Sequence, residues 1–400
     1  MEETSKLQLP ETFLRFLEAN GLDPSIYTHG DSIPRYVRLK PGLEDSLEEI
    51  ECEIKCKLEK VNWLAGFYSI PPHVHIASSK AYQQGKMYGI DAASGAAVSA
   101  LGISPGDHVL DLCAAPGAKL CMMLDLLGET GTATGVDVAK HRLAACRTIL
   151  QKYGVGQRSR LFLADGTTFS VPPTTNSGGS PCLDDHEDTF QQWTSRRPYK
   201  ERKQAAKARN HPVLPQYGQP EIIFYGQSSG VIGLQKKELY RSLDQQEYAF
   251  CGYDKVLVDA ECTHDGSIKH IQKFEQWGWT TLERRVLDAE RTDSNLTSLQ
   301  LNLLKNGFRL LKQGGTLVYS TCSRVTISLT HAQNEDVVDQ FLAEDSSAEL
   351  QEIEMAKDWP CRSGRIPKTV RFDPWTSATS GLFVAKIRKL PPKEAEKNVL

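Results

Sequence analysis

The hydrophobic and polar positions of this chain follow two patterns, and the change between them falls about a fifth of the way along it. Before that point, an amphipathic segment over 11–20 and an alternating segment over 35–39 predict a small α+β module, residues 1–78. After it, short apolar runs alternate with helical periods, an order typical of a parallel α/β sheet. The sequence therefore predicts an α/β domain over 79–390 and a tail over 391–400.

Six strands and four helices are expected within the larger domain. The strands are predicted over 108–113, 132–138, 160–165, 255–262, 316–322 and 381–387. The helices are predicted over 118–127, 139–153, 298–311 and 334–343. Because strands and helices alternate, the first five strands are expected to end at one edge of a mostly parallel sheet.

An insertion separates the third and fourth predicted strands. Their last polar residues, Asp165 and Asp259, lie 94 positions apart, whereas consecutive strands of such sheets need about 30 residues. Residues 171–250 are therefore predicted to form an insertion. Part of it is expected to be disordered, because 171–188 is rich in Pro, Thr, Ser, Gly and acidic residues.

The composition is that of a folded, soluble protein. Hydrophobic residues make up 40% and charged residues 24% of the chain. No apolar run approaches the ~18 residues of a membrane span, and the charged N-terminus shows no secretory signal. The ten cysteines follow no disulfide-scaffold spacing, and Cys52 and Cys56 lack a second pair of ligands, so we expect reduced thiols and no metal. We therefore expect no membrane partner and a location in the cytoplasm or the nucleus, the nucleolus included.

One segment of the insertion concentrates positive charge. The net charge of the chain is -3 and its pI is about 6.4, so a nucleic-acid partner would need a local basic surface. Residues 193–210 carry seven basic residues and one acidic residue, with Trp193 and Tyr199 among them. Such cations bind phosphates and such rings stack on bases. A nuclear localisation signal and a solvated charged helix are the competing interpretations.

Small residues and carboxylates stand where the predicted strands end. The first strand runs into Leu-Asp-Leu-Cys-Ala-Ala-Pro-Gly-Ala-Lys over 110–119, where the backbone at a helix N-terminus can approach an anion. The next three strands end at Asp137, Asp165 and Asp259, and a carboxylate after a second strand commonly binds ribose hydroxyls. Together they indicate a ligand site, although each Asp alone is as readily a helix or turn cap. Gly117-Ala118 departs from the dinucleotide fingerprint, which disfavours NAD.

Two cysteines close the fourth and fifth predicted strands. Cys262 follows Val-Asp-Ala-Glu, and Cys322 follows Tyr-Ser-Thr. A lone cysteine at such a place is most often a small buried apolar side chain. Neighbouring strands would bring these two together, however, and that suits a thiolate nucleophile facing a second thiol. Cytosine needs such a group, because its carbon 5 becomes nucleophilic only after a thiolate adds at carbon 6 and the base has left its stack.

These strings resemble the motifs of one enzyme family. The Nop/Sun family of RNA 5-methylcytosine methyltransferases has similar motifs, which correspond here to residues 110–119, 259–263, 319–323, 89–94, 333–336 and 381–386. The resemblance covers about residues 80–390 apart from the insertion. It implies a Rossmann-like domain that transfers a methyl group from S-adenosylmethionine to carbon 5 of cytosine in tRNA or rRNA.

The resemblance also implies roles for individual residues. Cys322 would be the nucleophile and Cys262 would assist product release, while Asp259 and Lys119 would lie at the target base. The residues implied in cofactor binding are Cys113, Ala114, Ala115, Pro116, Gly117, Ala118, Lys119, Asp137, Arg142, Asp165 and Asp259. Residues 35–40 resemble the family's small RNA-binding region. The expected partner is RNA, and the chain is expected to be a monomer.

The chain departs from the family pattern beside Cys262. Glu261 stands where the family usually has Pro, Thr263-His264 stand where it usually has Ser-Gly, and Ala118 replaces the second Gly of the first motif. Two alternatives therefore stay open. One is a pseudo-enzyme that binds RNA as a scaffold. The other is a methyltransferase for a small molecule or a protein, which has no use for paired cysteines because amines and hydroxyls attack a methyl group directly.

Overall fold

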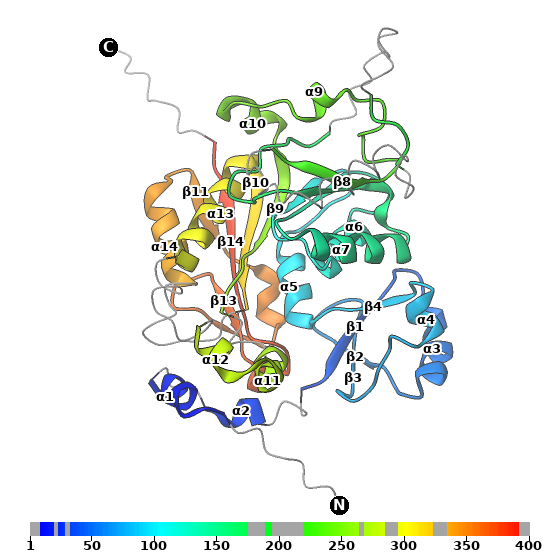
Figure 1. The fold of residues 1–400 in the computed structure, drawn as a ribbon, viewed down its shortest axis with the longest axis vertical. Coiled ribbons are helices and arrows are strands. Elements are labelled where there is room, and N and C mark those ends of the chain that lie inside the picture. The colour runs from blue at the N-terminus through cyan, green and yellow to red at the C-terminus, as the bar shows by residue number, and fades with distance from the viewer. Residues whose placement is uncertain are drawn as a thin grey trace, which may run out of the picture.

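The strands of the described residues form two sheets (Figure 1). The fold is given by a computed structural model, which describes residues 9–19, 23–28, 33–174, 189–193, 219–263, 268–284, 295–322 and 334–391. A four-stranded antiparallel sheet holds an N-terminal part of the chain. A ten-stranded sheet with helices on both faces holds most of the rest.

The larger sheet has a parallel centre with antiparallel strands at both sides. Its order is β12-β13-β14-β10-β9-β5-β6-β7-β8, with β11 paired to β14, and the pairs from β10 to β7 are parallel. The strands are β5 (His108–Asp111), β6 (Thr132–Asp137), β7 (Ser159–Leu163), β8 (Glu221–Tyr225), β9 (Tyr253–Asp259), β10 (Leu311–Thr321), β11 (Ala348–Gln351), β12 (Cys361–Ser363), β13 (Val370–Phe372) and β14 (Leu382–Lys389). The predicted Rossmann-like α/β sheet is confirmed.

Helices cover both faces of this sheet because its central strands are apolar on both sides. The helices on one face are α5 (Ala92–Ala100), α6 (Ala118–Leu126) and α7 (Lys140–Lys152), and those on the other are α10 (Gln245–Cys251), α13 (Thr297–Leu310) and α14 (Glu335–Glu344). The short helices α9 (Lys236–Leu239) and α15 (Pro374–Ser377) lie in connections. In α13, Leu301, Leu304 and Phe308 recur at the helical period and are buried, each stabilising the fold by about 1.5–3 kcal/mol.

The N-terminal sheet packs against the start of the larger domain. Its order is β2 (Glu59–Lys60), β3 (Phe67–Ile70), β1 (Arg35–Leu39) and β4 (Met87–Gly89), with α3 (Leu47–Ile54) and α4 (Lys80–Gln83) beside it. Arg38 and the Tyr88 hydroxyl both contact the Asp125 carboxylate of α6, the hydroxyl at 3.0 Å. Phe67 packs so closely on Gly95 of α5 that a side chain there would collide with its ring. Because β4 belongs to this sheet, the module continues past residue 78, its predicted boundary.

Helices α1 (Glu11–Ala19) and α2 (Ser25–Thr28) pack against a different part of the chain. They form an apolar cluster with α11 (Ile268–Trp277) and α12 (Trp279–Leu282). Phe13 and Leu17 of α1 are fully buried in this cluster with Phe274 and Leu282. The first helices therefore lie next to the segment that follows Cys262, at the bottom of Figure 1.

The side strands are where the sequence pattern and the structure differ. β8 falls inside the predicted insertion, and β11, β12 and β13 have only three or four residues each, too few for a period of two to stand out. β10 begins five residues earlier than predicted, because the register shift between Leu311 and Thr316 does not end the strand. Of the insertion, residues 175–188 and 194–218 lie outside the described residues. Its later part, with β8, α9 and α10, belongs to the domain.

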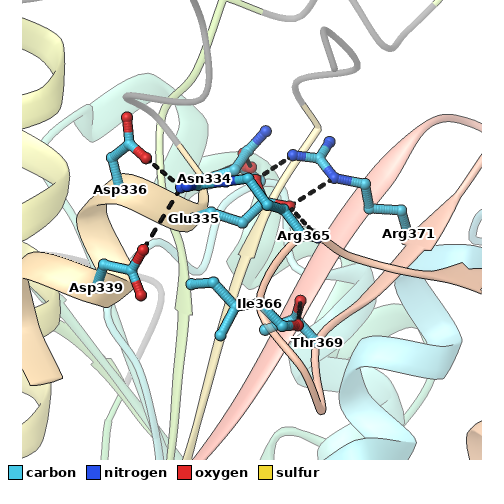
Figure 2. A network of polar contacts seen from close by, with 9 residues as sticks. Asn334, Glu335, Asp336, Asp339, Arg365, Ile366, Thr369 and Arg371 are labelled. Atoms are coloured by element: carbon cyan, nitrogen blue, oxygen red, sulfur yellow. Dashed lines mark hydrogen bonds and ion pairs between the residues drawn. The ribbon is translucent and has the colours of Figure 1, made fainter. Parts of the chain in front are cut away.

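A buried ion pair fixes α14 to the side strands (Figure 2). Glu335, in the first turn of α14, is fully buried and pairs through both carboxylate oxygens with Arg371 of β13, whose Nε donates to Oε1 at 2.9 Å. The Arg365 N–H donates to the same carboxylate at 3.2 Å, while its guanidinium contacts Asp336 and Asp339 at the surface. Burial favours the neutral acid, but the hydrogen bonds and charge of Arg371, together with backbone hydrogen bonds such as that from Arg365, outweigh burial and lower the pKa of Glu335. The carboxylate is therefore held ionised.

Arg371→Leu is expected to lower the free energy of unfolding by about 3–5 kcal/mol, because the Glu335 carboxylate would stay buried without its partner. Arg365→Ala is the matched control. Its guanidinium pairs with Asp336 at half exposure, so its loss should cost about 0–1 kcal/mol. Urea unfolding of both variants measures the difference. Equal losses would show that the buried pair does not hold α14 in place.

Candidate active site

The segment between β5 and α6 forms a tight loop at the carboxyl edge of the sheet. Gly117 is the N-cap of α6 and has a φ of 109°, a left-handed conformation that favours glycine. A Cβ at this position would lie 2.8 Å from the Sγ of Cys146 on α7. The loop is therefore pressed against α7. The predicted residues 113–118 offer mainly backbone, with the first N–H groups of α6, to a ligand at this edge.

Asp137 ties this loop to the end of β6. Its buried carboxylate accepts hydrogen bonds from Ala139 N–H at 2.8 Å and from Ala115 N–H at 3.3 Å. Arg142 lies beside it, with Nη1 3.4 Å from Asp137 Oδ2 and Nη2 donating to the Ala115 carbonyl at 2.7 Å. Three of the predicted cofactor residues thus belong to one network.

Asp165 shapes the turn that follows β7. Its Oδ1 accepts hydrogen bonds from the N–H and the hydroxyl of Thr167, at 2.8 and 2.7 Å. Asn306 of α13 holds the same turn, donating through its amide to the carbonyls of Gly166 and Phe169 at 2.7 and 2.9 Å. This is the turn cap that the sequence left open as an alternative. It also fixes a half-buried carboxylate at the same edge of the sheet.

Lys119, in the first turn of α6, forms an ion pair with Asp259 at the end of β9. Lys119 Nζ lies 2.8 Å from Asp259 Oδ2, and the Ser320 hydroxyl donates to Asp259 Oδ1 at 2.6 Å. Burial disfavours the lysine cation, but the charge of Asp259 and their hydrogen bond, with Asp111 and Cys322 adding to them, raise the pKa of Lys119. Lys119 is therefore held as a cation that also attracts a thiolate at Cys322.

The two cysteines that follow β9 and β10 lie in contact. Asp259 and Ser320 face each other in the parallel register of these strands. Cys262 and Cys322 follow them within three residues, and their sulfurs lie 2.7 Å apart. Both are reduced thiols, Cys262 only 2% exposed and Cys322 half-buried. The structure therefore brings the two predicted thiols together, beside the Lys119–Asp259 pair.

Glu261, the departure from the family pattern, leaves this geometry in place. The residue is exposed at the surface. Its backbone carbonyl accepts a hydrogen bond from the buried Gln300 amide of α13 at 2.7 Å. The backbone between Asp259 and Cys262 is thus held by a side chain of α13 where the family usually has a proline.

Two further residues of this edge were not singled out from the sequence. Asp111 ends β5, is 1% exposed, and accepts a hydrogen bond from Cys113 N–H at 3.1 Å. Burial raises its pKa to about 7, against the effect of that hydrogen bond. Val138, next to Asp137, is 63% exposed and offers apolar surface beside the loop. Their signals in the sequence are a fourth carboxylate at a strand end and an apolar residue directly after one.

The basic side chains of residues 35–40 make contacts mainly with other groups of the protein. Arg38 is 6% exposed and pairs with Asp125, and the Lys40 ammonium donates to a backbone carbonyl of the larger domain at 2.9 Å. These cations hold the N-terminal sheet to the domain. The predicted basic segment, from residue 194 to 210, lies outside the described residues.

The described ranges show neither an arrangement typical of a metal site nor a helix typical of a membrane span. No group of three or more His, Cys, Asp or Glu side chains there is arranged to hold a metal ion. No helix in those ranges is long and apolar enough to cross a bilayer. The ionisable groups that gather at the sheet edge include Asp111, Lys119, Asp137, Arg142, Asp165 and Asp259.

The sheet and its edge together define a class of protein. A small-residue loop after the first parallel strand, with Asp137, Asp165 and Asp259 at the ends of the others, is the arrangement of a Rossmann-like methyltransferase. The chain belongs to the family described as 16S rRNA methyltransferase RsmB/F, whose model matches residues 98–176 and 231–388. This match confirms the resemblance to the Nop/Sun motifs, and with it the prediction of an S-adenosylmethionine-dependent methyltransferase.

Individual proteins resemble this chain to different extents. The tRNA (cytosine(49)-C(5))-methyltransferase of Pyrococcus abyssi is 24% identical, over 97% of this chain and 95% of its own length. The 5-cytosine rRNA methyltransferase NSUN4 of Bos taurus is 28% identical over 63% of this chain, a match that spans 43% of the bovine protein. Among solved structures, a methyltransferase homolog from Pyrococcus horikoshii matches 96% of this chain and 100% of its own, with a TM-score of 0.58 and 22% identity. It has the same fold.

Asp111→Asn is expected to change how stability depends on pH. The pKa of this buried carboxyl is raised from 3.8 to about 7, so the folded state binds the proton more tightly than the unfolded chain. Its contribution to stability is greatest below about pH 4 and is lost as the pH rises through about 7. The melting temperature of the variant minus that of the wild type should therefore increase over this range and then level off. A constant difference would show that Asp111 is ionised in the folded protein throughout.

Proposed function

We propose that this protein methylates carbon 5 of a cytosine in RNA, with Cys322 as nucleophile and Cys262 assisting release. The observation that carries the proposal is the pair of reduced thiols whose sulfurs lie 2.7 Å apart at the edge of the sheet. Methyl transfer to an amine or a hydroxyl needs no thiol, whereas carbon 5 of cytosine becomes nucleophilic only after addition at carbon 6. The names of the relatives from P. abyssi and B. taurus, both given for cytosine methylation of RNA, support the same reaction.

The residues at the sheet edge fit S-adenosylmethionine. The loop over 113–119 approaches as backbone because Gly117 leaves no room for a Cβ, and the first N–H groups of α6 suit a carboxylate. Asp137 is the group we assign to the ribose, since each carboxylate oxygen has a second lone pair beyond its backbone bond. Asp165 is assigned to the adenine amine, and the exposed Val138 to the face of the adenine ring. When bound, the cofactor supplies an electrophilic methyl group.

Cys322 starts the reaction as a thiolate. Its sulfur forms a bond to carbon 6 of the extruded cytosine, and the electron pair of the C5–C6 double bond shifts toward carbon 4 and nitrogen 3. Carbon 5 becomes nucleophilic as negative charge develops on the ring. The Lys119 cation, which interacts with Cys322, favours the attacking thiolate and offsets the charge that develops.

Asp259 is the residue we assign to holding the base. Its two oxygens accept hydrogen bonds from Lys119 and Ser320, and each has a further lone pair for a donor on the substrate. Cytosine carries an amino group at carbon 4, where uracil carries an oxygen. A carboxylate at this place therefore selects cytosine over uracil.

Release of the product requires the loss of a proton from carbon 5. After methylation this carbon carries both the methyl group and its original hydrogen. A base takes the proton, the electron pair re-forms the C5–C6 double bond, and Cys322 leaves as a thiolate. Cys262 lies beside the sulfur whose bond to carbon 6 must break, and we assign this assistance to it.

Transfer RNA is the substrate that we propose. The P. abyssi relative, named for tRNA, is matched over nearly its whole length. NSUN4, named for rRNA, is matched over less than half of its length, although the family description itself names 16S rRNA. Coverage of the whole chain is therefore the argument for tRNA, and ribosomal RNA is the alternative that sequencing separates from it.

Bisulfite sequencing of total RNA, from cells with and without this protein, is expected to show the loss of one discrete methylcytosine from tRNA. Re-expression of the wild type should restore the signal, and re-expression of Cys322→Ala should not. Loss of a ribosomal position instead would change the substrate but keep the reaction. An unchanged methylation pattern would contradict the proposed reaction and favour an RNA-binding scaffold.

Substitution of the two cysteines is expected to have opposite effects on the covalent complex. Cys322→Ala should abolish methyl transfer and complex formation while cofactor affinity stays unchanged. Cys262→Ala should allow attack but slow release, so a protein–RNA complex stable to denaturing electrophoresis should accumulate. Cys251→Ala, at an exposed cysteine, is the matched control and should behave as wild type. Activity in Cys322→Ala would overturn the assignment of the nucleophile, and the absence of a complex in Cys262→Ala would overturn the release role.

A further inference from the structure

A buried hydrogen bond lies at the residue directly before the proposed nucleophile. Thr321, the last residue of β10, is fully buried, and its hydroxyl donates to Oδ1 of Asn334. Asn334 is fully buried as well and stands at the N-cap of α14 (Figure 2). The start of α14 is thus bonded to the strand end that carries Cys322.

The Asn334 side chain does not serve its own helix. An Asn at the N-cap usually accepts a hydrogen bond from a backbone N–H of the first turn, but this one makes no such cap bond. Its amide nitrogen is buried and has no hydrogen-bond partner within the described part of the chain. A buried, unpaired amide lowers stability. Stabilisation of α14 therefore does not account for the orientation of this side chain.

Glu335, the first residue of α14, is bonded to the same row of side chains across the sheet that contains Thr321. Arg371, Phe383 and Thr321 lie side by side on β13, β14 and β10, as the register of these strands requires. The Arg371 guanidinium carbon lies 5.2 Å from the centre of the Phe383 ring. Glu335 bonds to Arg371 at one end of this row and Asn334 bonds to Thr321 at the other. The N-cap and the first residue of α14 therefore fix both ends of one row of side chains.

The other thiol has a similar support. Gln300 of α13 is fully buried and donates through its amide nitrogen to the carbonyl of Glu261, the residue before Cys262. The oxygen of the Gln300 amide is buried and has no hydrogen-bond partner among the residues described. Each thiol is thus preceded by a residue that a buried carboxamide holds, and each carboxamide has one unpaired atom.

We propose that Asn334 and Thr321 are positioning residues for Cys322. Their hydrogen bond, braced by the Glu335–Arg371 pair, fixes the end of β10 so that the sulfur of Cys322 is aimed at carbon 6 of the base. The inference rests on the proposed function, since it assigns these residues to the nucleophile of that reaction. A displacement of reacting groups by about 1 Å costs a rate factor of about 100. The cofactor residues predicted at the ends of β5, β6 and β7 do not take part in this hydrogen bond.

Thr321→Val tests the proposal, because it removes the hydroxyl and keeps the shape of the side chain. We expect kcat for methylation of cytosine-containing RNA to fall by about 10- to 100-fold, with KM for RNA and affinity for S-adenosylmethionine unchanged. Thr321→Ser keeps the hydroxyl and should restore kcat to about the wild-type value. Thr316→Val is the matched control, since Thr316 is a buried residue of the same strand, away from Cys322. It should leave kcat unchanged.

A second measurement makes the result independent of turnover. The rate at which iodoacetamide alkylates Cys322, followed by mass spectrometry of its peptide, is expected to change in Thr321→Val and to stay at the wild-type rate in Thr321→Ser and Thr316→Val. Wild-type kcat and alkylation in Thr321→Val would overturn the proposal. So would equal losses in Thr316→Val, or a failure of Thr321→Ser to restore kcat. If the wild type itself methylates no RNA, the proposed function fails, and the alkylation rates alone decide whether Thr321 positions Cys322.

Discussion

The parallel register of β9 and β10 is the constraint on which the active site depends. It sets Asp259 opposite Ser320, so the hydroxyl bonds to the carboxylate and the two cysteines that follow arrive in contact. Side chains alternate between the faces of a strand, so a slip of one residue would send Ser320 to the wrong face and separate the thiols. Buried strands with helices on both faces, such as these, fix the register strongly.

The charge balance of the sheet edge follows from the same packing. Asp111, Asp137 and Asp259 come close enough to influence one another, and Lys119 is the cation that Asp259 holds among them. Asp111 reduces the repulsion by holding its proton more tightly than an exposed carboxyl would. An edge with an excess of carboxylates also attracts a ligand with a positive charge, such as the sulfonium of the cofactor. The residues that we assign to the cofactor and those that we assign to the base therefore share one electrostatic environment.

The parts of the molecule that can be predicted from the sequence are those whose hydrophobic and polar pattern lies in residues close together in the chain. The parallel strands, their order of Asp residues and the meeting of Cys262 with Cys322 follow from apolar periods and from the rule that parallel strands end at one edge. The packing of α1 and α2 on α11 and α12 could not be predicted, because its apolar partners lie more than 240 positions apart in the chain. The raised pKa of Asp111 depends likewise on burial by distant elements.

The polar groups around the thiols are better explained by orientation than by stability. Replacing a buried ion pair such as Glu335–Arg371 with well-packed apolar residues is often neutral or stabilising. A buried carboxamide with an unpaired atom, as in Asn334 and Gln300, lowers stability further. Apolar contacts, however, are non-directional and tolerate small displacements, whereas a hydrogen bond fixes both distance and angle. At the two strand ends that carry the sulfurs, one of which we assign to attack on a single carbon atom, directional bonds therefore achieve what apolar packing alone would not.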